Sequence, residues 1–200
     1  MLSDWLRLEL IEQGENIVWI EEHHVNDLEI FTEVVKVFTQ GADDYEMPLL
    51  KAAEMLVQQY VGKNDMILMD SLFPAYTWLF ASGVPKAVIS EISQKLADAL
   101  KPLNPLIIWL DGDVSVLLER AVAQRGNEWL KGLIGSINSY AYVPVRPVVD
   151  IRGVEEFFKN VQTLQSDMLS EWKHKLLKLN VTNAASSMLQ SEIKNNLEFD

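Results

Sequence analysis

Residues 65–73 of the chain read DMILMDSLF, in which residues 66–69 form a continuous apolar run that ends at Asp70. Residues 62–64, which precede the run, are the turn formers Gly-Lys-Asn. A short segment that is apolar at every position is typical of a parallel strand covered on both faces. The stretch therefore predicts a buried strand with Asp70 at its carboxyl end.

Three further segments have the same character. Residues 17–20 (IVWI) end at Glu21 and Glu22, residues 105–110 (PLIIWL) end at Asp111, and residues 176–181 (LLKLNV) form the last. Helical periodicity is found at 2–11, 25–39, 45–61, 72–82, 85–100, 114–124, 154–174 and 185–199. This alternation predicts an α/β fold, a parallel sheet flanked by helices. Because ligands of such sheets bind outside the carboxyl ends of the strands, we expect the acids to share one rim.

Composition limits the classes of protein to consider. With 200 residues, 48% hydrophobic and 23% charged, the chain is expected to form a single domain over residues 1–200. Its 17 Lys+Arg against 29 Asp+Glu give a net charge of -12, which disfavours nucleic-acid polymers and anionic membranes as partners. No apolar run approaches the ~20 residues of a spanning helix. There is no cysteine, which excludes thiolate chemistry and disulfides and favours a cytoplasmic location.

Residues 126–152 show no clean period and contain several glycines and prolines. We predict an irregular or partly helical excursion here, the segment best suited to act as a mobile cover.

The ordered set of segments resembles the P-loop nucleoside and nucleotide kinases, most of all the thymidylate-kinase-like branch. The residues that carry the resemblance are the helix ending at Gly14 before IVWIEE, then DMILMDSLF, then NPLIIWLDGDVSVLLERAVAQRG at 104–126 and KLLKLNVTN at 175–183. The resemblance implies a three-layer P-loop fold with residues 126–152 as its lid. It also implies ATP and Mg²⁺ as cofactors and a small nucleotide or similar molecule as acceptor, and it leaves a homodimer open.

The phosphate-binding loop of that family, G-x-x-x-x-G-K-[ST], occurs nowhere in the chain. The expected fold therefore lacks the first, central strand that precedes this loop. Two explanations remain: the chain is a truncated kinase lacking about twenty residues, or a degenerate member that has lost phosphoryl transfer. Because a missing central strand leaves unpaired sheet edges, truncation is the favoured explanation.

Asp70 is the main catalytic candidate. An acid at this strand end can hold magnesium or accept the hydroxyl proton of an acceptor. The alternative is a structural role, in which Asp70 caps the next helix. The family usually has arginine after this aspartate, whereas the chain has Ser71, which counts against a nucleoside monophosphate as acceptor.

Glu21, Glu22 and Phe73 are candidates for binding the acceptor. The resemblance implies that an acid near the first pair binds a sugar hydroxyl or serves as base, while a solvated loop is the alternative. Phe73, with Tyr76 and Trp78, can stack on a base or belong to the core.

The chain has only five arginines, and four of them are candidates for contacting phosphate. The resemblance places Arg125 where the lid begins, as a catalytic group that neutralises the transferred phosphoryl. Arg120 either binds substrate or pairs with an acid such as Glu119. Arg146 and Arg152 either close over phosphates or are solvated loop charges.

The sequence thus predicts an ATP-dependent phosphotransferase of the P-loop kinase type. A non-catalytic binding or scaffold protein that keeps the kinase architecture is the alternative. A third hypothesis, an acidic helical adaptor, requires the apolar runs to be helices.

Overall fold

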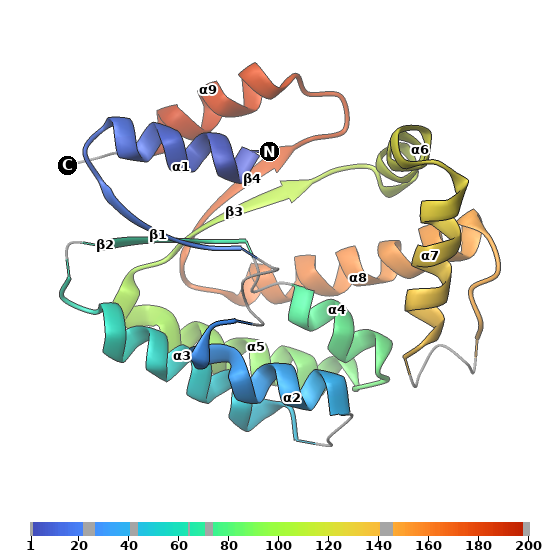
Figure 1. Ribbon diagram of the computed structural model, residues 1–200, viewed down its shortest axis with the longest axis horizontal. Helices are drawn as coiled ribbons and strands as arrows, with labels where there is room; N and C mark the ends of the chain where they lie inside the picture. The colour runs from blue at the N-terminus through green and yellow to red at the C-terminus, as the bar shows by residue number, and fades with distance from the viewer. Residues whose placement is uncertain are drawn as a thin grey trace.

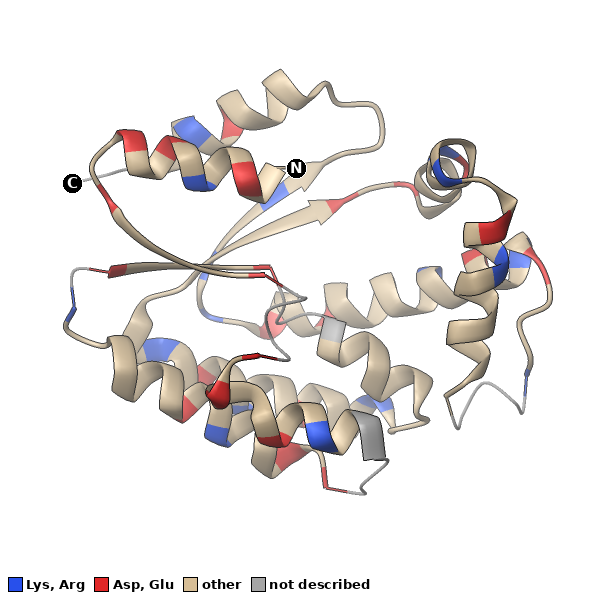
Figure 2. Ribbon diagram, in the orientation of Figure 1, with Lys and Arg blue, Asp and Glu red and all other residues tan. Residues whose placement is uncertain are grey.

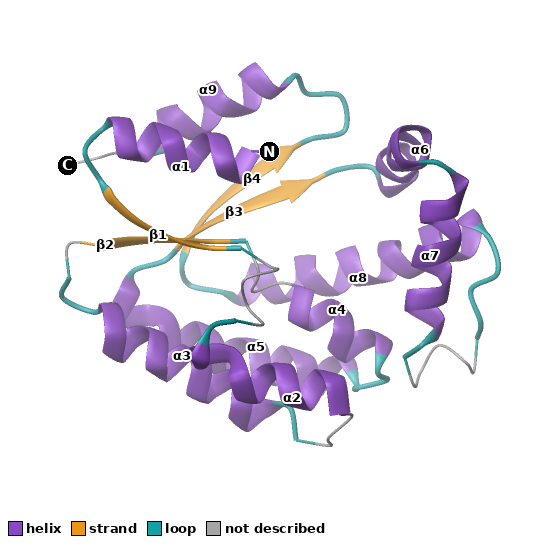
Figure 3. Cartoon of the chain, in the orientation of Figure 1, coloured by secondary structure: helices purple, strands orange, loops and turns teal. Residues whose placement is uncertain are grey.

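A computed structural model of the chain describes residues 2–21, 27–40, 44–63, 65–70, 74–140 and 146–197. Helices and strands alternate along it (Figures 1 and 3). The helices are α1 (Leu2–Glu12), α2 (Thr32–Gln40), α3 (Glu46–Tyr60), α4 (Pro74–Ala81), α5 (Lys86–Leu100), α6 (Val114–Arg125), α7 (Asn127–Asn138), α8 (Ile151–Glu171) and α9 (Ser186–Asn196). The strands are β1 (Asn16–Ile20), β2 (Asp65–Met69), β3 (Leu106–Asp111) and β4 (Lys175–Asn180), and short 3-10 turns occupy Glu29–Phe31 (η2) and Lys101–Leu103 (η3).

The four strands form two separate two-stranded sheets. β1 pairs with β2 in parallel, with Ile20 opposite Met69, and β3 pairs with β4 in parallel, with Asp111 opposite Asn180. The predicted α/β class with parallel strands is confirmed, whereas the described strands do not join into the single sheet that we expected. The acidic helical adaptor required helical apolar runs, so that hypothesis is wrong.

One face of both sheets is covered by α1 and α9. Leu6 and Leu10 of α1 and Ile193 of α9 are almost completely buried there. Strand side chains from both sheets pack against them: Ile17, Met66, Leu68, Ile108, Leu177 and Leu179. The two sheets therefore share one helical layer on this face.

The opposite face is covered by α3, α5 and α8. Ile20 lies in a buried cluster with Leu56 of α3, Ile89 of α5 and Leu164 of α8. Beneath the second sheet, Ile107 packs with Ala97 of α5 and with Leu169 of α8. Because α5 and α8 contribute to both clusters, these two helices connect the sheets from below.

Residues 127–138 form the helix α7, so the part of 126–152 that they occupy is helical, as one form of the predicted excursion allowed. The apolar residues Trp129, Leu130, Leu133, Ile134 and Ile137 follow a helical period and pack against α6 and α8. Gly132 and Gly135 hid that period, but a Cβ at either position would meet no other atom within 4 Å. Close packing therefore does not require glycine at either position.

Helix α2 begins later than expected. The period predicted a helix from residue 25, but Asp27 and Leu28 are not helical and Thr32 begins the helix after the η2 turn. Within the described ranges, no helix combines the length and the apolar character that crossing a bilayer requires.

Candidate functional site

The carboxyl ends of β1 and β2 bring two acidic residues side by side. Ile20 and Met69 are register partners, and the Asp70 N–H donates to the Ile20 C=O at 3.3 Å. Glu21 and Asp70 are the next residues on the two strands, so their backbones are neighbours. Paired strands lie about 4.8 Å apart, so the two residues begin their side chains from neighbouring backbone positions.

The carboxyl end of β3 is fastened by side chains from two other elements. The Asp111 carboxylate accepts a hydrogen bond from Gln162 Nε2 of α8 at 2.7 Å and forms an ion pair with Lys178 Nζ of β4 at 2.8 Å. Gln162 also donates to the Gly112 C=O at 2.7 Å. Asp111 is therefore committed to joining β3, β4 and α8.

Asp113 begins helix α6. Its carboxylate accepts from the Val116 N–H at 3.1 Å, and its own N–H donates to Thr182 Oγ1 at 2.8 Å. The Val116 N–H holds the pKa of Asp113 below its ordinary value because it stabilises the charged carboxylate, and Ser115 acts in the same direction. Asp113 therefore serves as a helix cap.

Arg120 of α6 donates from its guanidinium to the Thr182 C=O, in the connection that follows β4. This contact fastens α6 to the end of the second sheet. A phosphate bound by Arg120 would have to share the guanidinium with that carbonyl oxygen.

The other three predicted arginines, blue in Figure 2, lie at the end of α6 and around the start of α8, and Figure 1 shows α6 beyond the carboxyl end of β3. Arg125 ends α6, is exposed, and places its Cζ 5.3 Å from the centre of the Trp129 ring. Arg146 is exposed ahead of α8, and Arg152 is exposed in the first turn of that helix. No described contact joins these arginines to Glu21 or Asp70.

Two predicted site residues, Glu22 and Phe73, lie outside the described residues. Of the aromatic residues that follow Phe73, Tyr76 belongs to the core and is not open to a ligand, whereas Trp78 is half-buried. Tyr76 is completely buried, and burial raises the pKa of its phenol to about 12. Trp78 meets the ring of Phe38 edge-on, with ring centres 5.0 Å apart.

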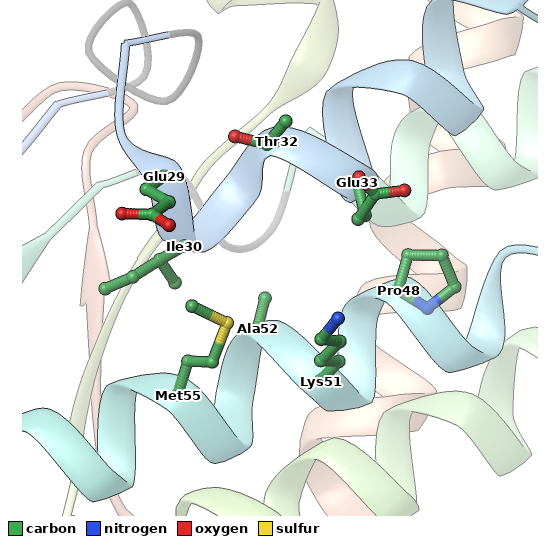
Figure 4. A pocket seen from close by; sticks show the side chains of 8 residues that line it. All are labelled: Glu29, Ile30, Thr32, Glu33, Pro48, Lys51, Ala52 and Met55. Atoms are coloured by element: carbon green, nitrogen blue, oxygen red, sulfur yellow. The ribbon is translucent and has the colours of Figure 1, made fainter.

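A hollow of about 230 Å³ lies between η2 and α3 (Figure 4). Its lining includes Glu33 of α2 and Lys51 of α3, and Figure 4 shows both side chains at its margin. Lys36 lowers the pKa of Glu33 through a hydrogen bond and its charge, and Lys51 adds a smaller effect. None of the lining residues is a strand-end acid, so the hollow is separate from the predicted site.

The sequence reasoning missed Gln162, Lys178 and Thr182, which engage the acids and the arginine at the end of the second sheet. Each is distant in the chain from its partner, and no local pattern marks it. Only the pairing of β3 with β4 and the passage of α8 beneath them bring these residues to the rim.

Within the described ranges, no three His, Asp or Glu side chains gather as a metal site would require. Glu21 and Asp70, whose backbones are neighbours, carry the carboxylate type of ligand that Mg²⁺ prefers in proteins.

No protein-family model matches the chain, and no match was found among curated proteins.

Proposed function

We propose that the chain is the larger part of an ATP-dependent phosphotransferase of the P-loop kinase type. Its acceptor would be a nucleoside, a nucleotide or a similar small molecule. The observation that supports this most is the pairing of the strands. The described strands form two separate parallel pairs, as expected of this fold when its central strand is not part of the sequence.

Each predicted residue has a role in this proposal. Asp70 holds Mg²⁺ or accepts the hydroxyl proton of the acceptor, and Glu21 and Glu22 bind the acceptor. Bound ATP supplies the phosphoryl group, and Mg²⁺ neutralises part of its charge. Arg125 stabilises the charge of the transferred group, while Arg120, Arg146 and Arg152 bind phosphate oxygens and Phe73 stacks on the acceptor.

The adjacent positions of Glu21 and Asp70 support this assignment, since a metal ion and an acceptor hydroxyl must meet at one place. The exposed guanidinium groups of Arg125, Arg146 and Arg152 support a cover that approaches from the α6–α8 side. Closure of such a cover excludes water from the reacting phosphate.

The triphosphate-binding loop must come from residues outside the 200 of this chain. We expect the codons in frame ahead of Met1 to encode an apolar strand followed by G-x-x-x-x-G-K-[ST]. A stop codon directly ahead of Met1 would instead favour the alternative, a binding protein that keeps the architecture without phosphoryl transfer.

Thermal unfolding with Mg²⁺-ATP tests the proposal on the protein itself. At a hundredfold excess over Kd, the ligand should stabilise the chain extended by its upstream codons by about 2.7 kcal/mol. For a protein of this size, that is a shift in Tm of about 5–10 °C. The 200-residue chain should show little shift.

Two variants locate the effect. Asp70→Asn in the extended chain should lower phosphoryl transfer to a panel of nucleosides and nucleotides by at least about 100-fold. Asp98→Asn, which alters an exposed acid on α5, should leave the rate unchanged. Equal rates for the two variants would rule out the role assigned to Asp70.

A further inference from the structure

The hollow between η2 and α3 has charged groups at its two ends and an apolar surface between them. Figure 4 shows Glu29 and Met55 at one end and Glu33 and Lys51 at the other. Ala52 of α3 lies between the ends, is 3% exposed, and contributes only a methyl group to the lining. This small side chain leaves room for a ligand between η2 and α3.

Two of the charged groups at the hollow are open to a ligand. Glu29 and Lys51 are exposed, and the described contacts include no hydrogen bond or ion pair of either side chain. Glu33, in contrast, forms an ion pair with Lys36 at 2.6 Å, and this contact is the main cause of its lowered pKa. The hollow therefore presents one open negative charge, from Glu29, and one open positive charge, from Lys51, at opposite ends.

Helix geometry gives the spacing of these ends. Lys51 and Met55 are four residues apart on α3, which corresponds to about 6 Å along the helix axis. Glu29 lies at the Met55 end (Figure 4), so the two open charges are separated along the hollow by about this length. An extended aliphatic chain of about four to six carbons covers such a distance.

Charge and volume narrow the class of ligand. A simple anion is repelled by the net charge of -12, and a simple cation is attracted to the whole acidic surface but repelled by Lys51 at this place. A zwitterion has no net charge and can meet both open groups at once. The volume of about 230 Å³ is smaller than the roughly 300–1,000 Å³ of pockets for drug-sized ligands, so the ligand is small.

The surface between the charges favours a hydrocarbon chain. Ile30, Pro48, Ala52 and Met55 contribute apolar side chains to the lining. Methylene groups placed against such residues are removed from water, which is favourable. A polar amide in the same place loses hydrogen bonds to water without gaining new ones. The middle of the ligand is therefore aliphatic.

We propose that the hollow between η2 and α3 binds an aliphatic ω-amino acid. The ammonium group lies at Glu29, the carboxylate lies at Lys51, and the hydrocarbon chain crosses Ala52. We expect weak binding, with a Kd of about 1 mM, because both ion pairs are exposed and the ligand is small. The inference does not depend on phosphoryl transfer, since no lining residue belongs to the predicted site.

NMR titration of the isotope-labelled chain with ω-amino acids of increasing length tests the spacing of the charges. The probes are glycine, γ-aminobutyrate, δ-aminovalerate and ε-aminocaproate. The amide signals of Ile30 and Ala52 should shift to saturation with δ-aminovalerate, and its Kd should be about 5-fold lower than that of glycine, whose charges are too close together. The amide signal of Leu179, buried beneath α1 and α9, serves as an internal control. No saturable shift, or equal Kd values for all lengths, would overturn the proposal.

Three further probes separate the class of ligand from simpler alternatives. Pentylamine and pentanoate each carry one of the two charges and should bind about 2–5-fold more weakly than δ-aminovalerate. Glycylglycine has similarly spaced charges but a peptide group in the middle, so it should also bind more weakly. Pentylamine that binds as tightly as δ-aminovalerate would reduce the hollow to acidic surface, and glycylglycine that does so would exclude an aliphatic ligand.

Charge reversal at each end locates the ligand. Glu29→Lys and Lys51→Glu should each weaken the binding of δ-aminovalerate, because both ends then carry the same sign. The double variant should restore binding, since a zwitterion can enter in the reversed direction. Glu54→Lys changes an exposed acid of α3 outside the hollow and should leave Kd unchanged. A double variant that keeps the wild-type circular dichroism but does not bind would refute the assignment, as would equal Kd values for Glu29→Lys and Glu54→Lys.

Discussion

Aspartates at the starts of two helices show how single side chains fix the ends of elements. Asp113 accepts the Val116 N–H at the start of α6, and Asp150 accepts the Gly153 N–H at 3.0 Å at the start of α8. The first N–H groups of a helix have no partner within it, so a side-chain oxygen stabilises them, and a negative charge there is also favourable. At this scale the sequence carried usable information, because Asp113 directly precedes the apolar period of its helix.

Removing the cap of α8 should destabilise the protein measurably. We expect Asp150→Ala to lower the free energy of unfolding by about 1 kcal/mol, because the Gly153 N–H loses its partner. Asp167→Ala changes an exposed aspartate within the same helix and should have a smaller effect. Urea unfolding followed by circular dichroism measures both. Equal losses in the two variants would show that the cap contributes nothing specific.

The charge of the other cap should make stability depend on pH. The folded pKa of Asp113 is lowered, so the folded chain binds the proton less readily than the unfolded chain. Its stabilising contribution is therefore complete above the unfolded pKa and is lost as the pH falls through the folded pKa. Asp113→Asn keeps a capping oxygen without the charge. The wild type should be more stable than this variant at pH 7, and the difference should shrink in urea titrations as the pH falls through the lowered folded pKa of Asp113. A constant difference would contradict the prediction.

Helices and strands were predictable where the apolar pattern was clear. Which elements would pair or pack with one another was not predictable. The apolar runs at 17–20 and 66–69 became β1 and β2 almost to the residue, because a strand covered on both faces is apolar throughout. The bounds of helix α7 could not be predicted, because two glycines interrupt its apolar pattern without facing any close neighbour. Nothing local indicated that β2 and β3 would not pair with each other, since strand pairing depends on contacts distant in sequence.

The connection between α7 and α8 depends on one asparagine. Asn138 accepts from the Val148 N–H at 2.9 Å and donates to the Val148 C=O at 2.6 Å, while the Val148 side chain is buried. Asn138→Ala leaves both backbone groups without this partner and should cost about 1–3 kcal/mol.

Asn138→Asp provides the matched comparison for this clamp. It retains the acceptor but cannot donate to the carbonyl, so its loss of stability in urea unfolding should equal or exceed that of the alanine variant. A urea unfolding midpoint equal to that of the wild type in both variants would mean that the two Asn138–Val148 hydrogen bonds do not contribute to stability.

The whole molecule is held together by helices that serve both sheets. Leu164 of α8 is 2% exposed in the cluster beneath β1 and β2, whereas Leu169 and Gln162 of the same helix contact the second sheet. We expect Leu164→Ala to reduce stability by about 2–5 kcal/mol. Because α8 couples the sheets, hydrogen exchange of the Leu68 amide in β2 and the Trp109 amide in β3 should accelerate by the same factor. Acceleration of Leu68 alone would show that the sheets unfold independently.

The candidate site was predictable only in part at this scale. The parallel direction of the strands indicated that Glu21 and Asp70 would lie at the same edge. Their backbones are neighbours in the fold because both follow register partners. The same reasoning expected Asp111 at a shared rim and Arg120 either on substrate or paired with an acid. In the fold Asp111 joins β3 to β4 and α8, and Arg120 fastens α6 to the connection after β4. Such commitments arise from tertiary packing, which the order of residues does not reveal.

In each two-stranded sheet, one edge of each strand has no strand partner among the described residues. These open edges affect whether molecules of the protein associate in solution. Molecules with unpaired strands tend to stack edge to edge, but a net charge of -12 makes copies of this chain repel one another. That repulsion reaches about 30 Å in 0.01 M salt and only about 3 Å in 1 M salt. Dilute buffer should therefore keep the protein dispersed, and concentrated salt should drive it toward fibrous precipitates.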